Sequence, residues 1–484
     1  MLRNRRSIPV ALCGLVFSAS ALAIPPSPIP GPSVGPDLVM SGLGSGNVGN
    51  DMGDVNGFGT SLWGSAAGVF GYSMNTVACN LGDADLAWFA TDNRHPVFGV
   101  QAYRYRTVDG AGRFEQVGMS WLKHGECGFD SARCTELVFP VPIPQTQPDC
   151  DGLGPFRTDI YGAAMNGDQQ FLGPRSEINP WTGAFPFPYI LQQNQTGSAP
   201  YKRLQINAAD MSVGGTYVFE VVGIATDEPD ANRFNNYSYR TGTFGGTGGT
   251  AFTFSGPTFA MQPALNAWRA IDPQVVITSV RPFGAADGQV MLGSRVTQIG
   301  PAVWRYEYAL FNMNFSAGVA EVSIPLNARS SVTSAGFDSP AYHSGEPYDP
   351  AAWIFTRGTA AATWTTAPFP SSPANANALR WSTTYNVRFD ADTPPVAGMM
   401  SLRAFSSATG GPDGAAFTIS APVPSPPPCR GDFNNDGATT TQDLVFFLAR
   451  FGTTVPPGQA PDLNNDGQIN TSDLTAFLSA FGCS

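Results

Sequence analysis

Lysine, histidine and charge in general are scarce in this chain. Of its 484 residues only 13% are charged, two are lysine and three are histidine. So low a charged fraction argues against a long exposed helix or a coiled coil. Acidic residues outnumber basic ones, 37 to 26, which gives a formal net charge of −11. An acidic surface repels phosphate backbones and anionic lipid headgroups. We therefore expect neither nucleic acid nor a membrane surface as a partner.

Several catalytic motifs are also missing. The sequence contains no H-E-x-x-H, no G-x-S-x-G and no Walker loop. Gly44, Gly46 and Gly49 match G-x-G-x-x-G, but no helical pattern follows them, so we interpret this segment as a loop. A glycosidase needs only two carboxylates close in space, which sequence spacing does not reveal. Loose candidates for such a pair are Glu115, Glu126, Asp159, Asp168 and Glu177.

The N-terminus has the pattern of an export signal. Three arginines precede an apolar run that starts at Ile8, and the run ends in Ala-Leu-Ala. This order is typical of a secretory signal peptide, here residues 1–23, with cleavage after Ala23. The apolar run is too short to span a bilayer comfortably. We expect a secreted protein, extracellular or at the cell surface, with no membrane span after cleavage.

Seven cysteines are present, and one of them, Cys13, lies inside the signal peptide. An even number in an exported chain predicts disulfides. A metal site is a weaker alternative because no C-x-x-C spacing occurs. Four cysteines lie within residues 79–150, where the pairing stays open, and two bracket the C-terminal segment. The six predicted disulfide cysteines are Cys79, Cys127, Cys134, Cys150, Cys429 and Cys483.

Short alternating segments dominate the middle of the chain. In the stretch from Trp304 to Leu310, large apolar residues fall on one face and charged residues on the other, which is the period of a β-strand. No segment of this region shows a convincing helical stripe. The fold class we predict is mainly β, with two antiparallel sandwich-like domains. Further predicted strands cover residues 97–105, 114–121, 217–224, 275–280 and 385–389.

Proline and glycine mark the predicted domain boundaries. A Pro-rich spacer covers residues 24–36, and a Pro-rich linker covers residues 421–428. Between them we place a β-rich domain over residues 37–265, which holds four cysteines, and a β-sandwich domain over residues 271–420. Residues 429–484 form a separate C-terminal module.

The C-terminal module contains a loop that occurs twice, 30 residues apart, as GDFNNDGATTTQD and PDLNNDGQINTSD. Carboxylate and amide oxygens on alternate residues, with glycine at the sixth position, are typical of an EF-hand-type calcium loop. The six acidic residues of this module all occupy loop positions 1, 5 and 12. We therefore predict two Ca2+ sites. Their predicted ligands are Asp432, Asn434, Asp436, Ala438, Thr440 and Asp443 in the first loop, and Asp462, Asn464, Asp466, Gln468, Asn470 and Asp473 in the second.

One helix is predicted after each loop. Leu444, Phe447, Leu448 and Phe451 recur as Leu474, Phe477, Leu478 and Phe481, at the spacing of an amphipathic helix. We expect the two apolar stripes to face each other as a small core. Three prolines directly before the first loop exclude a helix there, so this is not an ordinary EF-hand pair.

A loop followed by one helix, duplicated, resembles a dockerin, the calcium-dependent docking module that binds cohesin domains in polysaccharide-degrading assemblies. The flanking cysteines are similar to those of a dockerin subtype of secreted planctomycete proteins and imply a Cys429–Cys483 clamp. The resemblance implies a small α-helical EF-hand-type fold and a cohesin-like or cell-surface protein as partner. Loop positions 10 and 11 read the partner in this family. They correspond here to Thr441 and Gln442, and to Thr471 and Ser472.

Two hypotheses for the function follow. The first is a non-catalytic extracellular component that binds polysaccharide or another surface ligand and is docked through its C-terminal module. The second is a carbohydrate-active enzyme, a glycosyl hydrolase or lyase, because the resemblance implies polysaccharide breakdown as context. No catalytic residue is assigned from the sequence.

Overall fold

The computed structural model describes residues 32–43, 59–125, 128, 132–134, 150–244, 252–284, 287–341, 345–405 and 413–483. The predicted signal peptide, most of the N-terminal spacer, the glycine loop at residues 44–49, Glu126 and Cys127 lie outside them. Strands make up 43% and helices 11% of the structure, so the mainly β prediction is confirmed. No helix of the described residues is long and apolar enough to cross a membrane.

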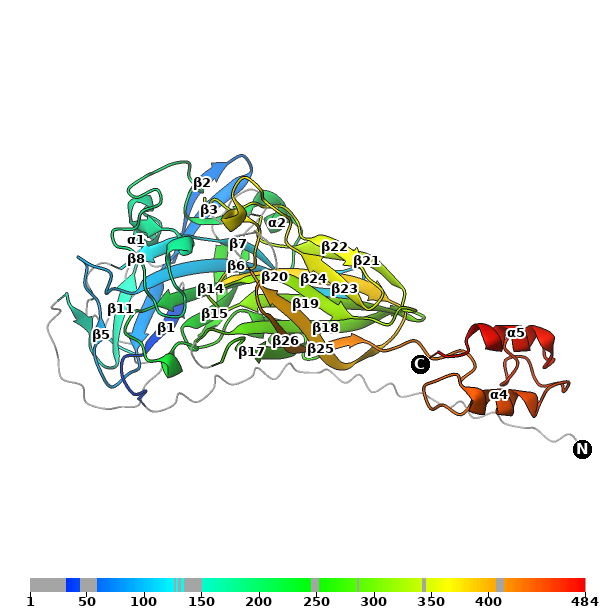
Figure 1. Cartoon of the computed structure of the whole chain (residues 1–484). Coiled ribbons are helices and arrows are strands. Elements are labelled where there is room, and N and C mark those ends of the chain that lie inside the picture. Colours follow the sequence, from blue (N-terminus) through cyan, green and yellow to red (C-terminus); the bar gives the residue numbers. More distant parts are fainter. Residues whose placement is uncertain are drawn as a thin grey trace, which may run out of the picture.

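A seven-stranded antiparallel sheet organises the first part of the chain (Figure 1). Its long central strands, β6 and β14, pair along nine residues. The strands run in the order β12 (Leu172–Gly173), β8 (Leu122–His124), β6 (Val97–Val108), β14 (Thr216–Ile224), β15 (Tyr237–Phe244) and β16 (Phe252–Phe259), and β7 (Ala111–Met119) also pairs with β6.

Smaller sheets cover one face of this sheet. Leu38 and Met40 of β1, Tyr72 of β3 and Ile206 of β13 pack with Phe219 of β14 in one buried cluster. Each sheet is antiparallel. One has the order β1 (Leu38–Leu43), β4 (Thr76–Asn80), β11 (Arg157–Tyr161), β9 (Ala132–Arg133); the second has β13 (Leu204–Asn207), β3 (Val69–Met74), β2 (Thr60–Ala66); the third has β10 (Gly152–Leu153), β5 (Leu86–Ala87).

Two five-stranded antiparallel sheets form a sandwich in the second part of the chain. Tyr306, Tyr308 and Leu310 of β19 point into the core between them, as their alternation predicted. One sheet has the order β17 (Val276–Val280), β18 (Val290–Gly300), β19 (Val303–Asn312), β24 (Thr383–Ala391), β21 (Val332–Asp338). The other has β22 (Ile354–Arg357), β23 (Ala361–Thr365), β20 (Val319–Pro325), β25 (Pro395–Ala404), β26 (Ala416–Pro424).

The sandwich packs directly against the seven-stranded sheet. Phe114 of β7, Trp268 of the helix α3 (Leu265–Ile271) and Phe311 of β19 belong to one buried cluster that spans the two parts. The Asn386 side chain donates a hydrogen bond to the Phe114 carbonyl oxygen (2.7 Å). The face of β19 that carries Glu307 is therefore buried as well, although its alternation suggested a polar outer face.

Short helices fill the connections of the body. They are α1 (Ala163–Asn166), α2 (Ala208–Ser212), α3, and the 3-10 turns Gln169–Phe171, Arg175–Glu177, Asp230–Asn232 and Pro373–Asn375. The sequence did not reveal α3, because a helix of seven residues is too short to display a clear period.

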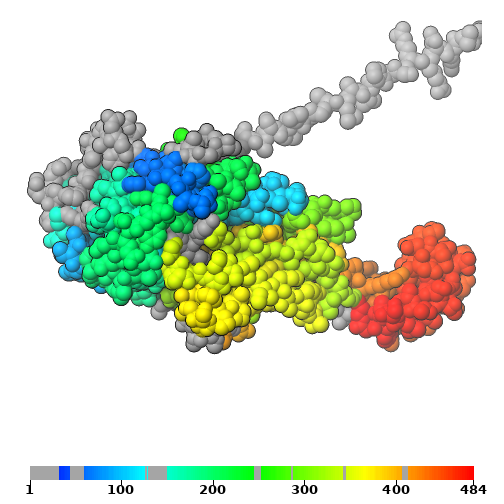
Figure 2. Space-filling view, turned by 90° about the horizontal axis from the view of Figure 1, so that it is seen from above, coloured from blue at the N-terminus to red at the C-terminus, as the bar shows by residue number. Residues whose placement is uncertain are grey.

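The C-terminal module lies beyond the far end of the sandwich (Figures 1 and 2). It holds α4 (Thr441–Leu448) and α5 (Thr471–Ser479). The predicted linker at 421–428 is too long, because residues 421–424 belong to β26 and pair with β25. Proline is tolerated there since β26 is an edge strand that pairs on one side only.

Candidate metal centre

The structure brings together three aspartates in each C-terminal loop. Carboxylate oxygens of Asp432, Asp436 and Asp443 lie within 4.8 Å of one another, and those of the second loop do the same. The second group consists of Asp462, Asp466 and Asp473. No Lys or Arg of the described residues forms an ion pair with any of the six.

Backbone N–H groups hold the first acid in place. Asp432 accepts hydrogen bonds from the backbone of Asp436 (3.1 Å) and of Gly437 (2.9 Å), so the chain curls around its carboxylate. Gly437 has φ +91°, and Asn435 also has positive φ, at +57°. A side chain other than glycine is strained at the first of these angles. The Asn434 side-chain oxygen accepts a further bond from the Asp436 backbone (2.9 Å).

The acid at position 12 joins the loop to its helix. One oxygen of Asp443 accepts from the backbone N–H of Phe433 (2.8 Å) and of Asn434 (3.2 Å), and the other accepts from that of Thr440 (2.9 Å). Burial raises the pKa of Asp443, but these N–H donors outweigh that effect and hold its pKa below the ordinary value. Asp443 therefore stays ionised beside the other two carboxylates.

The second loop repeats this geometry. Asp462 accepts from the backbone of Asp466 (3.2 Å) and of Gly467 (2.8 Å), whose φ is +82°. Asp473 accepts from the backbone of Leu463, Asn464 and Asn470, as its counterpart does in the first loop.

The remaining predicted ligands occupy the expected loop positions, and two of them also cap the helix that follows their loop. Thr440 and Asn470, at position 9, are helix N-caps whose side-chain oxygens accept from the backbone of Gln442 (3.2 Å) and of Ser472 (2.7 Å). Both helices thus begin with a capping box. Position 7 is filled by Ala438 and Gln468, whose backbone N–H groups donate to Asp436 and Asp466.

The four residues expected to read a partner lie at the starts of the two helices. Thr441, Gln442, Thr471 and Ser472 are all exposed. The Gln442 side-chain oxygen accepts a hydrogen bond from the Asn434 side chain (3.1 Å), so this residue also touches the first loop.

The two halves of the module are interlocked. Thr439 of the first loop exchanges backbone hydrogen bonds with Gly482 and Cys483, after α5. Ile469 of the second loop bonds in the same way to Gly452 and Thr453, after α4. Each loop is therefore completed by the end of the other helix, which explains why the repeat occurs as a pair.

The core of the module is smaller than the stripes suggested. Phe447 and Phe477 are fully buried and stack at 5.7 Å between ring centroids. The prediction that the full stripes form the core is wrong for four of the eight residues, because Leu448, Phe451, Leu478 and Phe481 are exposed. Val445, outside the stripe, is also exposed and adds to the apolar surface of α4.

The disulfide prediction is borne out where the structure describes it. Cys429 is bonded to Cys483, and Cys79 to Cys134. Cys150 is disulfide-bonded as well, and Cys127 lies outside the described residues. The Cys429–Cys483 bond joins the two ends of the C-terminal module.

Four of the five loosely proposed catalytic carboxylates lie in the described residues, and all four have structural partners. Asp159 accepts a hydrogen bond from the backbone of Ile160 (2.8 Å), and Asp168 accepts one from the backbone of Gln170 (3.1 Å). Glu115 accepts hydrogen bonds from Arg104 and Arg106, and Glu177 accepts from the backbone of Ile190 (2.8 Å) and Leu191 (2.6 Å). These contacts hold strands and a loop in place.

Comparison with known proteins assigns this chain to no family. A scan of the sequence against known protein families finds no match, and a search of curated proteins finds none either.

Proposed function

We propose that the C-terminal module binds two Ca2+ ions and, in that state, docks this exported β protein onto a partner protein. The observation that carries the proposal is the repeated convergence of three aspartates, held by backbone N–H groups and paired with no cationic side chain of the described residues. Three ionised carboxylates within 4.8 Å of one another repel each other unless a cation lies between them.

The donor set favours calcium over other metals. Each loop offers carboxylate, amide and backbone carbonyl oxygens, and neither histidine nor a free thiol occurs in it. Oxygen-only ligands in an irregular loop suit Ca2+, whereas Zn2+ prefers nitrogen and sulfur.

The exposed apolar residues support docking. Leu448 and Phe451 of α4 occupy the same positions as Leu478 and Phe481 of α5, and all four are exposed. Exposed apolar groups that cluster on a small module are typical of a protein interaction surface. Together with the resemblance to dockerins, they favour a cohesin-like or cell-surface protein as partner. For the body we propose a non-catalytic role in binding polysaccharide or another surface ligand.

A calcium titration of the full chain by calorimetry tests the metal sites. We expect two sites in the unmodified protein, and one in each of Asp432→Ala and Asp462→Ala. Asp413→Ala, an exposed position outside the loops, is the matched control and should retain two. Absence of calcium binding in the unmodified chain would remove the basis of the docking proposal.

A further inference from the structure

Two of the three histidines of the chain form a buried pair in the body. His95 lies just before β6, and His124 is the last residue of β8, which pairs with β6. Their imidazole nitrogens, Nε2 of His95 and Nδ1 of His124, are 3.1 Å apart. The two residues are only 1% and 4% exposed. Because they are shielded from solvent, their ring nitrogens depend on protein groups for hydrogen bonds.

The hydrogen bonds of the pair fit two neutral rings. Nδ1 of His95 lies 3.1 Å from the Phe89 carbonyl oxygen, which can only accept, so His95 carries a proton on Nδ1. Its Nε2 then accepts from Nδ1–H of His124. The remaining nitrogen, Nε2 of His124, is buried without a hydrogen-bond partner among the described residues. A proton on this atom would be a buried donor without an acceptor, and the ring would carry an unpaired buried charge.

Three aromatic rings cover the pair. They belong to the segment Phe185–Tyr189, which contains no helix or strand and which we call the covering segment. The centroid of the Phe185 ring lies 5.3 Å from those of both imidazoles, and the Phe187 centroid lies 4.8 Å from that of His95. Tyr189 stacks on the other imidazole at 4.8 Å. The covering segment therefore packs on the body through the two imidazoles.

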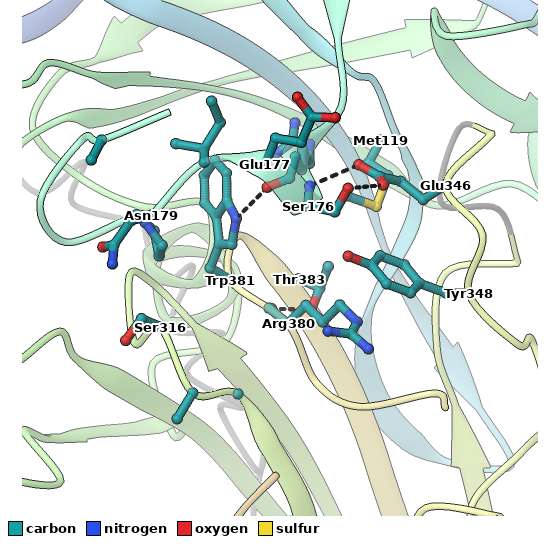
Figure 3. A pocket seen from close by; sticks show the side chains of 16 residues that line it. Met119, Ser176, Glu177, Asn179, Ser316, Glu346, Tyr348, Arg380, Trp381 and Thr383 are labelled. Carbon is teal, nitrogen blue, oxygen red and sulfur yellow. Dashed lines mark hydrogen bonds between the residues drawn. The ribbon is translucent and has the colours of Figure 1, made fainter. Parts of the chain in front are cut away.

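The connection that holds the covering segment is anchored at both ends. At its start, Ser176 donates hydrogen bonds to Glu346 from its backbone N–H (3.0 Å) and its hydroxyl (2.6 Å). Both residues line the cavity of about 350 Å3 between the two parts of the body (Figure 3). At its end, the backbone N–H groups of Ile190 and Leu191 donate to Glu177. The covering segment lies between these anchors, so it can lift away from the histidines while the anchors stay in place.

No ion pair balances a charge on the histidines. Neither ring forms one in the described part of the chain. On β8 the neighbouring charged group is Lys123, which is buried and would repel an imidazolium at His124. On β12, the backbone of Gly173 lies against Nε2 of His124, where a Cβ atom would come within 2.2 Å. The covering segment adds Tyr189 as its one titratable group.

The loop before His95 does not supply the missing countercharge. Its charged side chains, Asp92 and Arg94, pair with each other at 2.6 Å and are exposed. Burial lowers the pKa of His95, and this effect outweighs the attraction of Asp92. Burial, the neighbouring imidazole and Lys123 together lower the pKa of His124 well below its ordinary value. Both rings therefore stay neutral while they are covered.

We propose that the histidine pair is a pH-dependent switch, which keeps the covering segment closed while both rings are neutral and opens it when a ring takes up a proton. In the opened state the imidazoles reach water and titrate at an ordinary pKa of about 6.5. Below that value the opened state binds more protons than the closed one, so the free energy that keeps the segment closed falls as pH decreases. Opening exposes the three aromatic side chains that cover the pair.

The protonation states are tested by NMR of the full chain labelled with 15N-histidine, whose spectrum contains only three imidazoles. We expect two of them to be neutral at pH 7.5, to carry their proton on Nδ1, and to titrate with midpoints below about 6.5. Fewer than two imidazoles of this kind would overturn the inference, because the closed segment would then cover a ring that is charged or differently protonated.

Opening is measured by hydrogen exchange of the peptides that contain residues 185–191 in the full chain, corrected for the pH dependence of intrinsic exchange. From pH 7.5 to 5.5 we expect protection to fall about tenfold if the opened state takes up one proton, and about a hundredfold if it takes up two. The double variant His95→Phe, His124→Phe keeps aromatic rings at both positions but cannot titrate there, so its protection should not change with pH. Glu220→Gln, which removes a different buried titratable group, is the control and should respond as the unmodified chain does.

Constant protection of the unmodified chain between the two pH values would overturn the inference. An equal loss of protection in the unmodified chain and in the double variant would do the same, since the histidines would then not be the groups that titrate. If the double variant does not fold, the imidazole titration decides, because it is read on the unmodified chain.

Discussion

The guanidinium of Arg113 in β7 lies against the carboxylate of Glu307 in β19, with 2.8 Å between Nη2 and Oε1. The two side chains are 6% and 1% exposed, and they belong to the two different parts of the body. A buried ion pair of this kind is strongly destabilised when one partner is removed, because the other charge stays buried. This pair therefore couples the stability of the sandwich to that of the seven-stranded sheet.

Arg113→Met should lower the free energy of unfolding by about 3–5 kcal/mol, since Glu307 loses its countercharge. Urea unfolding followed by tryptophan fluorescence measures the change. Arg94→Met, which breaks the exposed ion pair with Asp92, is the control and should cost at most about 1 kcal/mol. Adding Glu307→Leu to Arg113→Met should restore most of the loss. Equal stability of Arg113→Met and Arg94→Met would contradict this role of the pair.

Glu220 makes the stability of the body depend on pH. Its carboxylate is buried next to the domain interface, where it accepts hydrogen bonds from the Tyr103 hydroxyl (3.0 Å) and the Gln101 side chain (3.2 Å). Burial raises its pKa from 4.5 to about 7 despite these donors. Between these two pH values the folded chain keeps a proton that the unfolded chain has lost, so stability falls as pH rises through this window.

Glu220→Gln should remove that contribution because glutamine is neutral at every pH. As pH rises from 4.5 to 8, the unmodified chain should lose about 3 kcal/mol of unfolding free energy relative to this variant. Urea unfolding at several pH values measures it. A difference that stays constant with pH would show that Glu220 does not titrate in this range.

The sequence predicted the strands of the body because alternation is a local property. The stretch from Trp304 to Leu310 lies in β19, and the segment at 385–389 lies in β24. What alternation does not reveal is the partner of each face. Arg305 and Glu307 were expected on a polar outer face, yet both are buried against the other part of the body. Their burial depends on ion pairs with residues far along the chain, which only the tertiary structure brings together.

The two acidic loops of the C-terminal module were recognisable because their pattern is local. The predicted ligands of each loop lie within twelve consecutive residues, so spacing alone places them on one turn. The hydrogen bonds between Ser176 and Glu346 in the body could not be found in this way. Ser176 and Glu346 are 170 residues apart, and no local pattern connects them. The amphipathic stripes of the module predicted its two helices correctly. They did not predict the size of the core, because this depends on how the two short helices cross. Four of the eight stripe residues are exposed and do not belong to the core.

Phe447 and Leu448 are neighbours in α4 with opposite environments, fully buried and 53% exposed, respectively. Phe447→Ala should destabilise the module by about 3–5 kcal/mol, because it removes half of the stacked pair with Phe477. Leu448→Ala should change stability by no more than about 0.5 kcal/mol. Hydrogen exchange of the α4 and α5 peptides in the full chain, with calcium present, distinguishes the two. Equal protection in both variants would contradict the assignment of the core.

The Cys429–Cys483 disulfide closes a loop with a sequence separation of 54 residues around both groups of three aspartates. Replacing both cysteines by serine releases the ends of the unfolded module and should cost it about 2–4 kcal/mol. If binding and folding of the module are linked, the lost stability appears as weaker calcium binding, and we expect the apparent affinity to fall at least tenfold. Calorimetry of the full chain measures this change. The Cys79→Ser, Cys134→Ser variant removes a disulfide of the body instead and should leave calcium affinity unchanged. If both double variants bind calcium as the unmodified chain does, the module is preformed without its clamp, and the disulfide does not contribute to its metal sites.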